Sequence, residues 1–255
     1  MSELTVSLPT DPGLREALAD EPGVTFVTWD MEGAAPGRRF DLVVPPYWGG
    51  NRQLAHLAGV ETRLVQWQSI GYNGVTKYLP EGVPLANAAT VHETSTAELA
   101  LALTLSAQRG IPEFVRDGLE HRWDLRSFPS LADRRVLLIG YGGVSKAIEA
   151  RLAGFEVEIT RLARTSREET NLAGETVAVH GFAELHARLA EAEIVIMAVL
   201  LTAETTGLLD AAALAALPDG ALLVNVARGP VVGAEARIAG LGAGGLRAAP
   251  DVADA

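Results

Sequence analysis

The sequence contains no cysteine and only two lysines, Lys77 and Lys146, so that 19 of its 21 basic residues are arginine. Without thiols the chain can hold no disulfide framework, no cysteine nucleophile and no thiolate metal site. No apolar run reaches the roughly 18 residues that a membrane-spanning helix requires. The first residues, MSELTVSLPT, also lack the basic and apolar regions of a secretory signal. We therefore expect a cytoplasmic protein without a membrane partner.

Positive charge is scarce as well. The formal net charge is −11 and the isoelectric point is near 4.9, which argues against nucleic acid as a partner, because nucleic-acid binders concentrate Lys and Arg. The histidines and carboxylates show no metal-ligand spacing, and no Ser-His-Asp set is readable. With 48% hydrophobic and 21% charged residues over 255 positions, the chain has the composition and the length of a folded protein with one or two domains.

Short β-branched runs alternate with helical patterns along the whole chain, which is typical of parallel sheets built from βαβ units. The apolar stretch 93–109 is apolar nearly all round, so we expect a buried helix that links two halves. A last helix is expected over 234–241, although glycines follow and interrupt it. The expected strands cover residues 5–8, 24–29, 42–45, 64–68 and 84–88 in the first half, and 135–139, 157–162, 176–179, 194–199 and 221–226 in the second.

The strongest local signal is the run from Arg135 to Ser145, in which an apolar strand leads directly into glycines and a helix. In a dinucleotide-binding turn, Gly140 would permit the tight bend, and Gly142 would let the backbone approach a pyrophosphate at the helix N-terminus. The third position of the G-x-G-x-x-G fingerprint is Ser145, which makes the contact between helix and strand more crowded. The alternative is an ordinary strand-to-helix turn without a ligand, but the strand–turn–helix context favours cofactor binding.

The end of the next strand predicts which dinucleotide is bound. An Asp or Glu there would accept a hydrogen bond from the ribose 2′-hydroxyl of NAD, but residues 159–167 contain no carboxylate. Arg164, Thr165 and Arg167 offer donors suited to a 2′-phosphate instead. We therefore predict NADP as the cofactor, with NAD as the alternative; the segment could also be a solvated basic loop.

Four ordered motifs resemble those of the D-isomer-specific 2-hydroxyacid dehydrogenases. Asn225 to Val232 is similar to the N-x-x-R-G signature of that family, and Leu201 to Leu208 to its L-T-x-x-T-x-G-L segment. Upstream, Ser95 to Ala100 resembles the start of the family's bridging helix, and Gln68 to Tyr72 stands where the family has its S-x-G substrate loop. The resemblance spans nearly the whole chain.

The resemblance implies a doubly wound parallel-sheet (Rossmann) domain in residues 94–255 and a smaller flavodoxin-like α/β substrate domain in residues 1–93. It implies a small 2-oxo or 2-hydroxy acid as substrate, and a homodimer formed around the cofactor domain. Arg228 would be the catalytic residue that pairs with the substrate carboxylate, a role suited to the guanidinium fork. The backbone of Ser69, Ile70 and Gly71 would bind the same carboxylate. The residues expected to touch the cofactor are Thr96, Gly140, Tyr141, Gly142, Gly143, Val144, Ser145, Arg164, Thr165, Arg167, Val199, Thr205, Ala227 and Asp251.

The resemblance also has departures. In the family a D-V-x-x-x-E-P-L-P run supplies a glutamate and a later P-H supplies the proton-exchanging histidine, whereas Asp251 and Val252 are followed here only by Ala-Asp-Ala255. The family's return segment is not present either. Losing general acid catalysis typically costs about 10²- to 10⁴-fold in rate, so we expect an oxidoreductase that is weak or inactive. The alternatives are a catalytically silent dinucleotide-binding sensor or scaffold, and an enzyme repurposed to other chemistry. His92 is the one histidine that could substitute as the acid.

Overall fold

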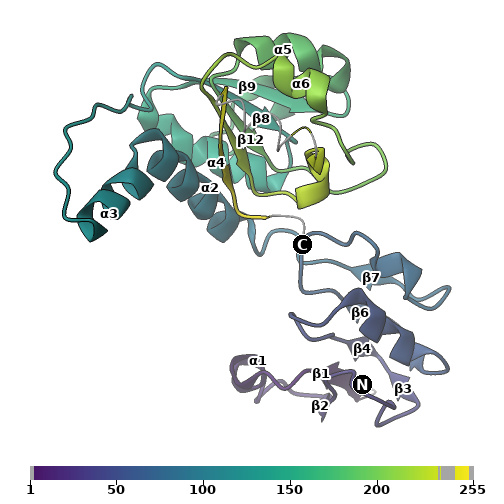
Figure 1. The fold of residues 1–255 in the computed structure, drawn as a ribbon. Coiled ribbons are helices and arrows are strands. Elements are labelled where there is room, and N and C mark those ends of the chain that lie inside the picture. Colours follow the sequence, from purple (N-terminus) through teal and green to yellow (C-terminus); the bar gives the residue numbers. More distant parts are fainter. Residues whose placement is uncertain (1–2, 235, 237–244, 253–255) are drawn as a thin grey trace. The chain divides into compact units, whose positions relative to one another are not determined.

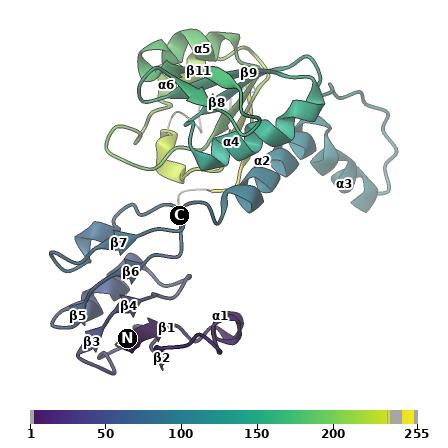
Figure 2. The ribbon, with the colours of Figure 1, turned by 180° about the vertical axis from the view of Figure 1, so that it is seen from behind.

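The computed structural model describes residues 3–234, 236 and 245–252. The chain divides into two compact units, residues 1–92 and 93–255, which we call unit 1 and unit 2 and describe separately. None of the helices in the described ranges is both long enough and apolar enough to cross a bilayer. Figures 1 and 2 show the ribbon from opposite sides.

Unit 2 contains a seven-stranded sheet with the strand order β10-β11-β9-β8-β12-β13-β14. All neighbouring strands run parallel except β10, which pairs antiparallel with β11. Counted from β8 and without β10, this is the order 3-2-1-4-5-6 of a Rossmann domain, so the predicted fold class is confirmed. The strands are β8 Arg135–Ile139, β9 Glu158–Ala163, β10 Arg167–Thr170, β11 Thr176–Gly181, β12 Ile194–Met197, β13 Ala221–Asn225 and β14 Leu246–Pro250.

Helices cover both faces of this sheet (Figure 1). Successive strand residues point to opposite faces: Val136 and Leu138 join a cluster with α2 and α4, whereas Leu137 and Ile139 join one with α5 and α6. The central strands β8 and β12 are therefore almost wholly apolar, as is typical of strands buried on both sides. The helices of unit 2 are α2 Glu93–Gln108, α3 Ile111–Leu119, α4 Gly143–Leu152, α5 Leu185–Glu191 and α6 Ala211–Ala215, with 3₁₀ turns η3 Ala153–Phe155, η4 Phe182–Glu184 and η5 Gly229–Val231.

Two expectations for unit 2 need correction. The helix α2 is not buried all round: Ala97, Ala100, Thr104 and Gln108 form one buried stripe at helical spacing, while Leu99 on another face is 38% exposed. Small alanines let α4 approach one side closely, and no described element covers the other side completely. The segment after β9 is also more than a loop, because Arg167 begins the strand β10. The helix expected over 234–241 falls almost wholly outside the described residues.

Unit 1 has a five-stranded parallel sheet with the order β2-β1-β4-β6-β7, which is the flavodoxin-like order 2-1-3-4-5 and confirms that part of the predicted fold. Trp29, Phe40, Leu54, Val65 and Trp67 belong to the buried cluster on one face. The elements are β1 Leu4–Leu8, α1 Pro12–Ala17, β2 Val24–Thr28, β4 Leu42–Val43, η1 Asn51–Leu57, β6 Val65–Gln66, η2 Val75–Lys77 and β7 Leu85–Ala86, beside a separate pair of strands, β3 Arg39–Phe40 and β5 Glu61–Thr62.

The other face of the unit 1 sheet borders a groove of about 690 Å³ with a mainly apolar lining. Val6, Leu8 and Val44 form its buried floor, and Leu14 and Leu18, in and just after α1, pack against them. A parallel sheet normally has both faces covered. Unit 1 is therefore closed on one face and open on the other over the described residues.

Candidate cofactor-binding site

The predicted cofactor residues of unit 2 gather at one edge of its sheet. Residues 140–145 follow β8, residues 164–166 follow β9, residues 199–205 follow β12, residues 226–228 follow β13, and residue 251 follows β14. These strands are parallel, so their carboxyl ends meet at the same edge. β8 lies between β9 and β12, where the strand order reverses, and ligands of open α/β sheets bind at such a switch point. Thr96 is in the first turn of α2.

The turn after β8 has the backbone that a pyrophosphate site needs. Gly140 has φ of +88°, and a Cβ there would lie 2.6 Å from the carbonyl oxygen of Ala198, so only glycine fits. A Cβ on Gly142 would instead meet nothing within 4 Å. Gly142 is the N-cap of α4, and no side chain caps the helix there. The first N–H groups of α4 thus lie beside open space, which suits an anion.

Ser145 adapts the third fingerprint position. Its side chain is fully buried, and its hydroxyl donates a hydrogen bond to the carbonyl oxygen of Gly140. The hydroxyl therefore links the first and last residues of the turn by a hydrogen bond, where a glycine would leave only backbone contacts. Gly143 is less constrained, since a Cβ there would lie 2.8 Å from Cγ of Glu93 at the start of α2, a side chain that can move.

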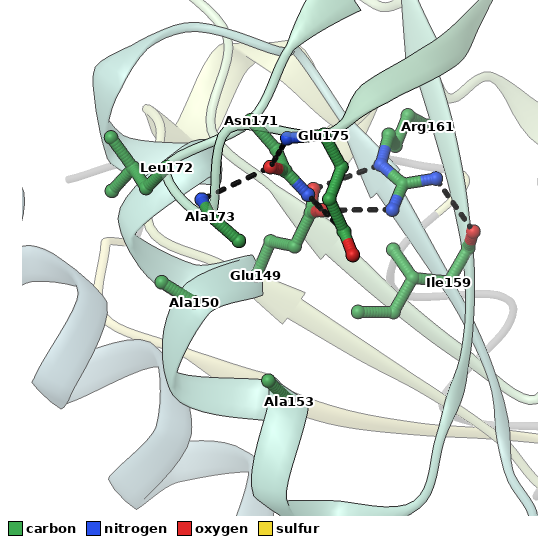
Figure 3. Close-up of a pocket in the computed structure, with 9 residues that line it drawn as sticks. All are labelled: Glu149, Ala150, Ala153, Ile159, Arg161, Asn171, Leu172, Ala173 and Glu175. Carbon is green, nitrogen blue, oxygen red and sulfur yellow. Dashed lines mark hydrogen bonds and ion pairs between the residues drawn. The ribbon is translucent and has the colours of Figure 1, made fainter.

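Tyr141, the residue between the two glycines of the turn, is held by a buried polar network. Its hydroxyl donates to Glu149 on α4 over 2.6 Å. Glu149 accepts two further hydrogen bonds of 2.8 Å from the guanidinium of Arg161 on β9, and one of 3.0 Å from the amide of Asn171. Figure 3 shows Glu149, Arg161 and Asn171 around a small pocket of about 190 Å³.

This network shifts the pKa values of its members. Burial, and then the hydrogen bond with Glu149, raise the pKa of Tyr141 to about 12. For Glu149, burial acts to raise the pKa, but the hydrogen bonds from Arg161, Tyr141 and Asn171 outweigh it and lower the pKa. The network is thus a charged pair that neutral hydrogen bonds complete, and it fixes the Tyr141 ring beneath the turn. Sequence reasoning missed it; the available signal was a charged residue, Arg161, in the interior of the strand β9.

The basic residues predicted to bind a 2′-phosphate occupy different surroundings. Arg164 is exposed, and its Nε lies 2.6 Å from a carboxylate oxygen of Glu204, which belongs to the segment after β12. Thr165 is also exposed. Arg167 donates to the carbonyl oxygen of Tyr141 over 3.2 Å and to that of Thr165 over 3.4 Å. Its guanidinium therefore joins the turn at residues 140–145 to the segment after β9.

The remaining predicted residues lie in segments that buried side chains brace. Val199 packs beside Gly140, where a Cβ of the glycine would meet its Cγ1 at 2.8 Å. The hydroxyl of Thr205 donates to the carbonyl oxygen of Leu200 over 2.6 Å and accepts from the N–H of Thr202. Thr205 thus shapes its own loop.

The signature segment after β13 is braced by Asn225. Its side chain accepts from the N–H of Ala227 over 2.9 Å and donates to the carbonyl oxygen of Arg228 over 3.1 Å. Asn225 is buried, while the side chain of Arg228 is half-buried and donates to the carbonyl oxygen of Ala227. The N–H of Asp251 pairs with the carbonyl oxygen of Asn225 over 3.0 Å. The asparagine of the signature is therefore structural, a role that sequence reasoning did not assign.

In unit 1 the predicted substrate residues form a loop after β6. The carbonyl oxygens of Ser69, Ile70 and Gly71 accept hydrogen bonds from Ala88 N–H, the Asn87 amide and the Trp67 indole, at 3.1, 2.9 and 3.0 Å. No acceptor for the three N–H groups is found among residues 3–234, 236 and 245–252. A loop fixed through its carbonyls, with its N–H groups available, can bind an anion.

Two of the histidines have contacts that the structure describes. Nε2 of His92 lies 2.8 Å from the carbonyl oxygen of Gln68, and its ring contacts that of Tyr47. His180 lies on β11 within an ion-pair cluster with Glu184 and Arg188. In the part of the chain that the structure describes, no three His, Asp or Glu side chains converge as metal ligands.

Comparison with known proteins shows which family the chain resembles. Residues 101–255 match the NAD binding domain of the D-isomer specific 2-hydroxyacid dehydrogenases. A glyoxylate reductase of Pyrococcus furiosus is 31% identical over 200 residues, which are 73% of this chain and 58% of the relative. The chain thus spans less than two thirds of the length of that relative.

Solved structures agree in fold. A D-isomer specific 2-hydroxyacid dehydrogenase of Xanthobacter autotrophicus Py2, in complex with NADPH and MES, matches 98% of this chain and 81% of its own with 29% identity and a TM-score of 0.77. An NADPH-dependent glyoxylate/hydroxypyruvate reductase of Sinorhizobium meliloti matches the same shares with 21% identity and a TM-score of 0.81, which speaks for the fold alone. The resemblance predicted from the four motifs is confirmed. The chain belongs to the D-isomer specific 2-hydroxyacid dehydrogenase family, whose NAD binding domain it carries in residues 101–255.

Proposed function

We propose that unit 2 binds NADP(H) in preference to NAD(H), and that the protein reduces small 2-oxo acids to D-2-hydroxy acids. The observation that carries the proposal is the edge of the unit 2 sheet, where the open space beside Gly142 and the donors of Arg164 and Arg167 follow neighbouring strands. No carboxylate follows β9 directly to bind a ribose 2′-hydroxyl. The name of the Pyrococcus relative and the NADPH in the Xanthobacter structure agree with this assignment.

Each unit, taken by itself, offers candidate donors for the carboxylate of a substrate. In unit 2, Arg228 offers a planar guanidinium whose paired N–H groups match two carboxylate oxygens. In unit 1, the N–H groups of Ser69, Ile70 and Gly71 offer neutral donors. The nicotinamide cofactor, when bound, supplies the hydride for the C2 carbonyl. The carbonyl oxygen then needs a proton, and Nε2 of His92 is already engaged by Gln68.

The test of this proposal separates binding from turnover. We expect the chain to bind NADPH and to reduce glyoxylate or pyruvate with kcat well below about 1 s⁻¹, because Nε2 of His92, the histidine considered as a substitute acid, is held by the carbonyl oxygen of Gln68. Arg228→Gln should lower kcat/KM at least about 100-fold while leaving the Kd for NADPH unchanged. Arg63→Gln, an exposed arginine of unit 1, is the control. Equal kcat/KM for both variants would refute the role of Arg228, and NADPH binding without any turnover would favour a silent sensor or scaffold.

Assembly is a second part of the proposal. The helix α3 and the chain that follows extend away from the sheet of unit 2 in both views (Figures 1 and 2). Val115, Leu119, Trp123 and Leu125 on this extension are 57%, 77%, 88% and 84% exposed. Monomers rarely expose such a set of large apolar side chains together. We propose that a second copy of the chain covers them in a homodimer, together with the open side of α2.

Sedimentation velocity at micromolar concentration tests the homodimer. We expect a dimer for the unmodified chain, and a monomer for Trp123→Glu, because a carboxylate there would be buried without a partner. Leu172→Glu, a 64% exposed leucine outside this extension, should remain dimeric. A monomer at all concentrations for the unmodified chain would contradict the proposal.

A further inference from the structure

One acidic side chain lies between the basic groups of the cofactor edge. Oε2 of Glu169, on β10, is 2.9 Å from Nε of Arg167, and its Oε1 is 3.1 Å from Nζ of Lys146 in α4. The three side chains are partly exposed, by 30%, 37% and 22% respectively. The hydrogen bond with Arg167, and then that with Lys146, lower the pKa of Glu169. A single carboxylate therefore serves as the anion for both basic groups.

Arg167 has little freedom to turn elsewhere. The guanidinium donates through its two terminal nitrogens to the carbonyl oxygens of Tyr141 and Thr165, and through Nε to Glu169. Lys146 is held as well. It is the fourth residue of α4, and its Nζ lies 5.9 Å from the centre of the Tyr141 ring. Both cations thus lie where the turn at residues 140–145 meets the segment after β9.

The place of Glu169 in the chain differs from that of the acidic residue of NAD-binding Rossmann domains. That residue stands at the carboxyl end of the second strand and binds the ribose. Here the corresponding residues 163–166 have no carboxylate, and Glu169 comes from the antiparallel strand β10, which turns back along the sheet edge. An incoming 2′-phosphate would bring about two negative charges to two cations whose charge Glu169 already neutralises in part.

We propose that Glu169 is a specificity-determining residue: its carboxylate occupies the anion position between Arg167 and Lys146 and competes there with the 2′-phosphate of NADP(H). The inference rests on the proposed binding of NADP(H) to unit 2. It predicts that the preference for NADPH over NADH is lower than the basic residues alone would give, and that the preference increases when Glu169 loses its charge.

The chain offers a matched control for this idea. Glu168 precedes Glu169 on β10 and is exposed, and neighbouring strand residues point to opposite sides. Glu168→Gln removes the same charge from nearly the same place without touching the contact with Arg167 and Lys146. If Glu169 only ties the edge strand to α4, Glu169→Gln should lower the melting temperature and change the affinity for phosphorylated and unphosphorylated nucleotides alike.

The experiment measures the Kd of NADPH, NADH, adenosine 2′,5′-bisphosphate and AMP by titration calorimetry, for the unmodified chain, Glu169→Gln and Glu168→Gln. For Glu169→Gln we expect affinity for the two 2′-phosphorylated ligands to rise about tenfold, because one like charge is removed at contact distance in a partly exposed site. The Kd values for NADH and AMP should change less than about twofold, and Glu168→Gln should change none of the four by more than that. The gain should shrink at high salt.

Two results would overturn the inference. If Glu169→Gln leaves the ratio of 2′-phosphorylated to unphosphorylated affinities unchanged, or if Glu168→Gln raises that ratio equally, Glu169 does not determine specificity, although NADP(H) binding stands. If the unmodified chain binds none of the four ligands, the proposed function fails and this inference fails with it. Glu169→Asp, which keeps the charge, should retain the original ratio more closely than Glu169→Gln does.

Discussion

Unit 1 and unit 2 are both doubly wound parallel sheets, yet they differ in how fully the two faces of the sheet are covered. In unit 2 the strands have four to six residues, and each face has its own large buried cluster. In unit 1 the strands β4, β6 and β7 have two residues each, one face has a large cluster, and the other borders the apolar groove. The same architecture, with two different strand orders, thus has fully covered faces in unit 2 and an incompletely covered face in unit 1.

The two units also differ in how they hold the backbone of the segments predicted to bind ligands. In unit 2, packed helices, the buried Tyr141 network and the close approach of Gly140 to Ala198 hold the turn at residues 140–145. In unit 1, the loop at Ser69–Gly71 follows a two-residue strand and depends on three hydrogen bonds to its carbonyls. Local hydrogen bonds there replace what packing does in unit 2.

The largest effect is expected when a glycine beside open space is replaced by leucine in each unit. Only the replacement in unit 2 should abolish the binding of NADPH. Gly142→Leu would fill the space beside the N-terminus of α4, so affinity for NADPH should fall by about two orders of magnitude or more. Gly50→Leu in unit 1 also enters open space from an extended backbone, and should leave the Kd unchanged. The measurement is titration calorimetry, with circular dichroism to verify the fold. Unchanged affinity in Gly142→Leu would break the assignment of the cofactor to this turn.

The next effect concerns stability. Ile148 in unit 2 and Leu54 in unit 1 are both fully buried, and truncation of either to alanine should cost about 2–5 kcal/mol. Because each unit has its own core, we expect two calorimetric transitions. Trp29 and Trp67 are buried in unit 1, so tryptophan fluorescence should follow the transition that Leu54→Ala shifts. NADPH should raise the transition that Ile148→Ala shifts. One transition, moved equally by both variants, would show that the units unfold together.

A smaller effect is expected from single exposed arginines. Arg164 in unit 2 and Arg63 in unit 1 are 64% and 63% exposed, and each is paired with a carboxylate. Arg164→Ala should weaken the binding of NADPH by about 1 kcal/mol, or roughly fivefold in Kd, and should hardly change the binding of NADH. Arg63→Ala should weaken neither. The gap between NADPH and NADH should narrow in added salt, and equal affinities at low salt would refute the role of Arg164.

The smallest effect at neutral pH is that of ionisation on stability, which should become measurable only at acid and alkaline pH. Hydrogen bonds from the Thr5 N–H and then from Arg63 lower the pKa of Asp41 in unit 1. The pKa of Glu149 in unit 2 is also lowered. Both units should therefore lose stability as the pH falls through these lowered pKa values. Tyr141 has a raised pKa, so unit 2 should also lose stability as the pH rises from about 10 through about 12. Tyr141→Phe should remove this alkaline loss and the late part of the phenolate absorbance change near pH 12, while the other three tyrosines continue to ionise. An unchanged alkaline profile would contradict the burial of Tyr141.

Much of the fold and the family could be predicted from the sequence. The alternation of apolar strands with helical stretches is local and periodic, and the turn at Gly140–Gly142 depends on residues that are consecutive in the chain. The segment at Asn225–Arg228 is likewise contiguous, so its motif is readable without knowledge of tertiary contacts. The residues at the carboxyl ends of successive strands come together because parallel strands end at one edge.

What could not be predicted depends on contacts between distant residues. Glu149 and Arg161 are 12 positions apart and on different elements, and nothing in their spacing indicates a pair. The hairpin of β10 and β11 places Glu169 beside Arg167 and Lys146, whereas the sequence suggests only a basic loop. The one-sided burial of α2 follows from the approach of α4 to its alanines, and an apolar count cannot show which side remains open.

The scarcity of lysine has a practical consequence. Lys77 in unit 1 is exposed and lies 5.6 Å from the ring centre of Tyr78, while Lys146 in unit 2 is bound to Glu169. Reductive methylation with ¹³C-formaldehyde would thus place one labelled side chain in each unit, besides the terminal amine. Two methyl resonances would then report on the two units separately. The resonance of Lys146 should move when a nucleotide displaces Glu169, and the resonance of Lys77 would serve as the internal reference in the same spectrum.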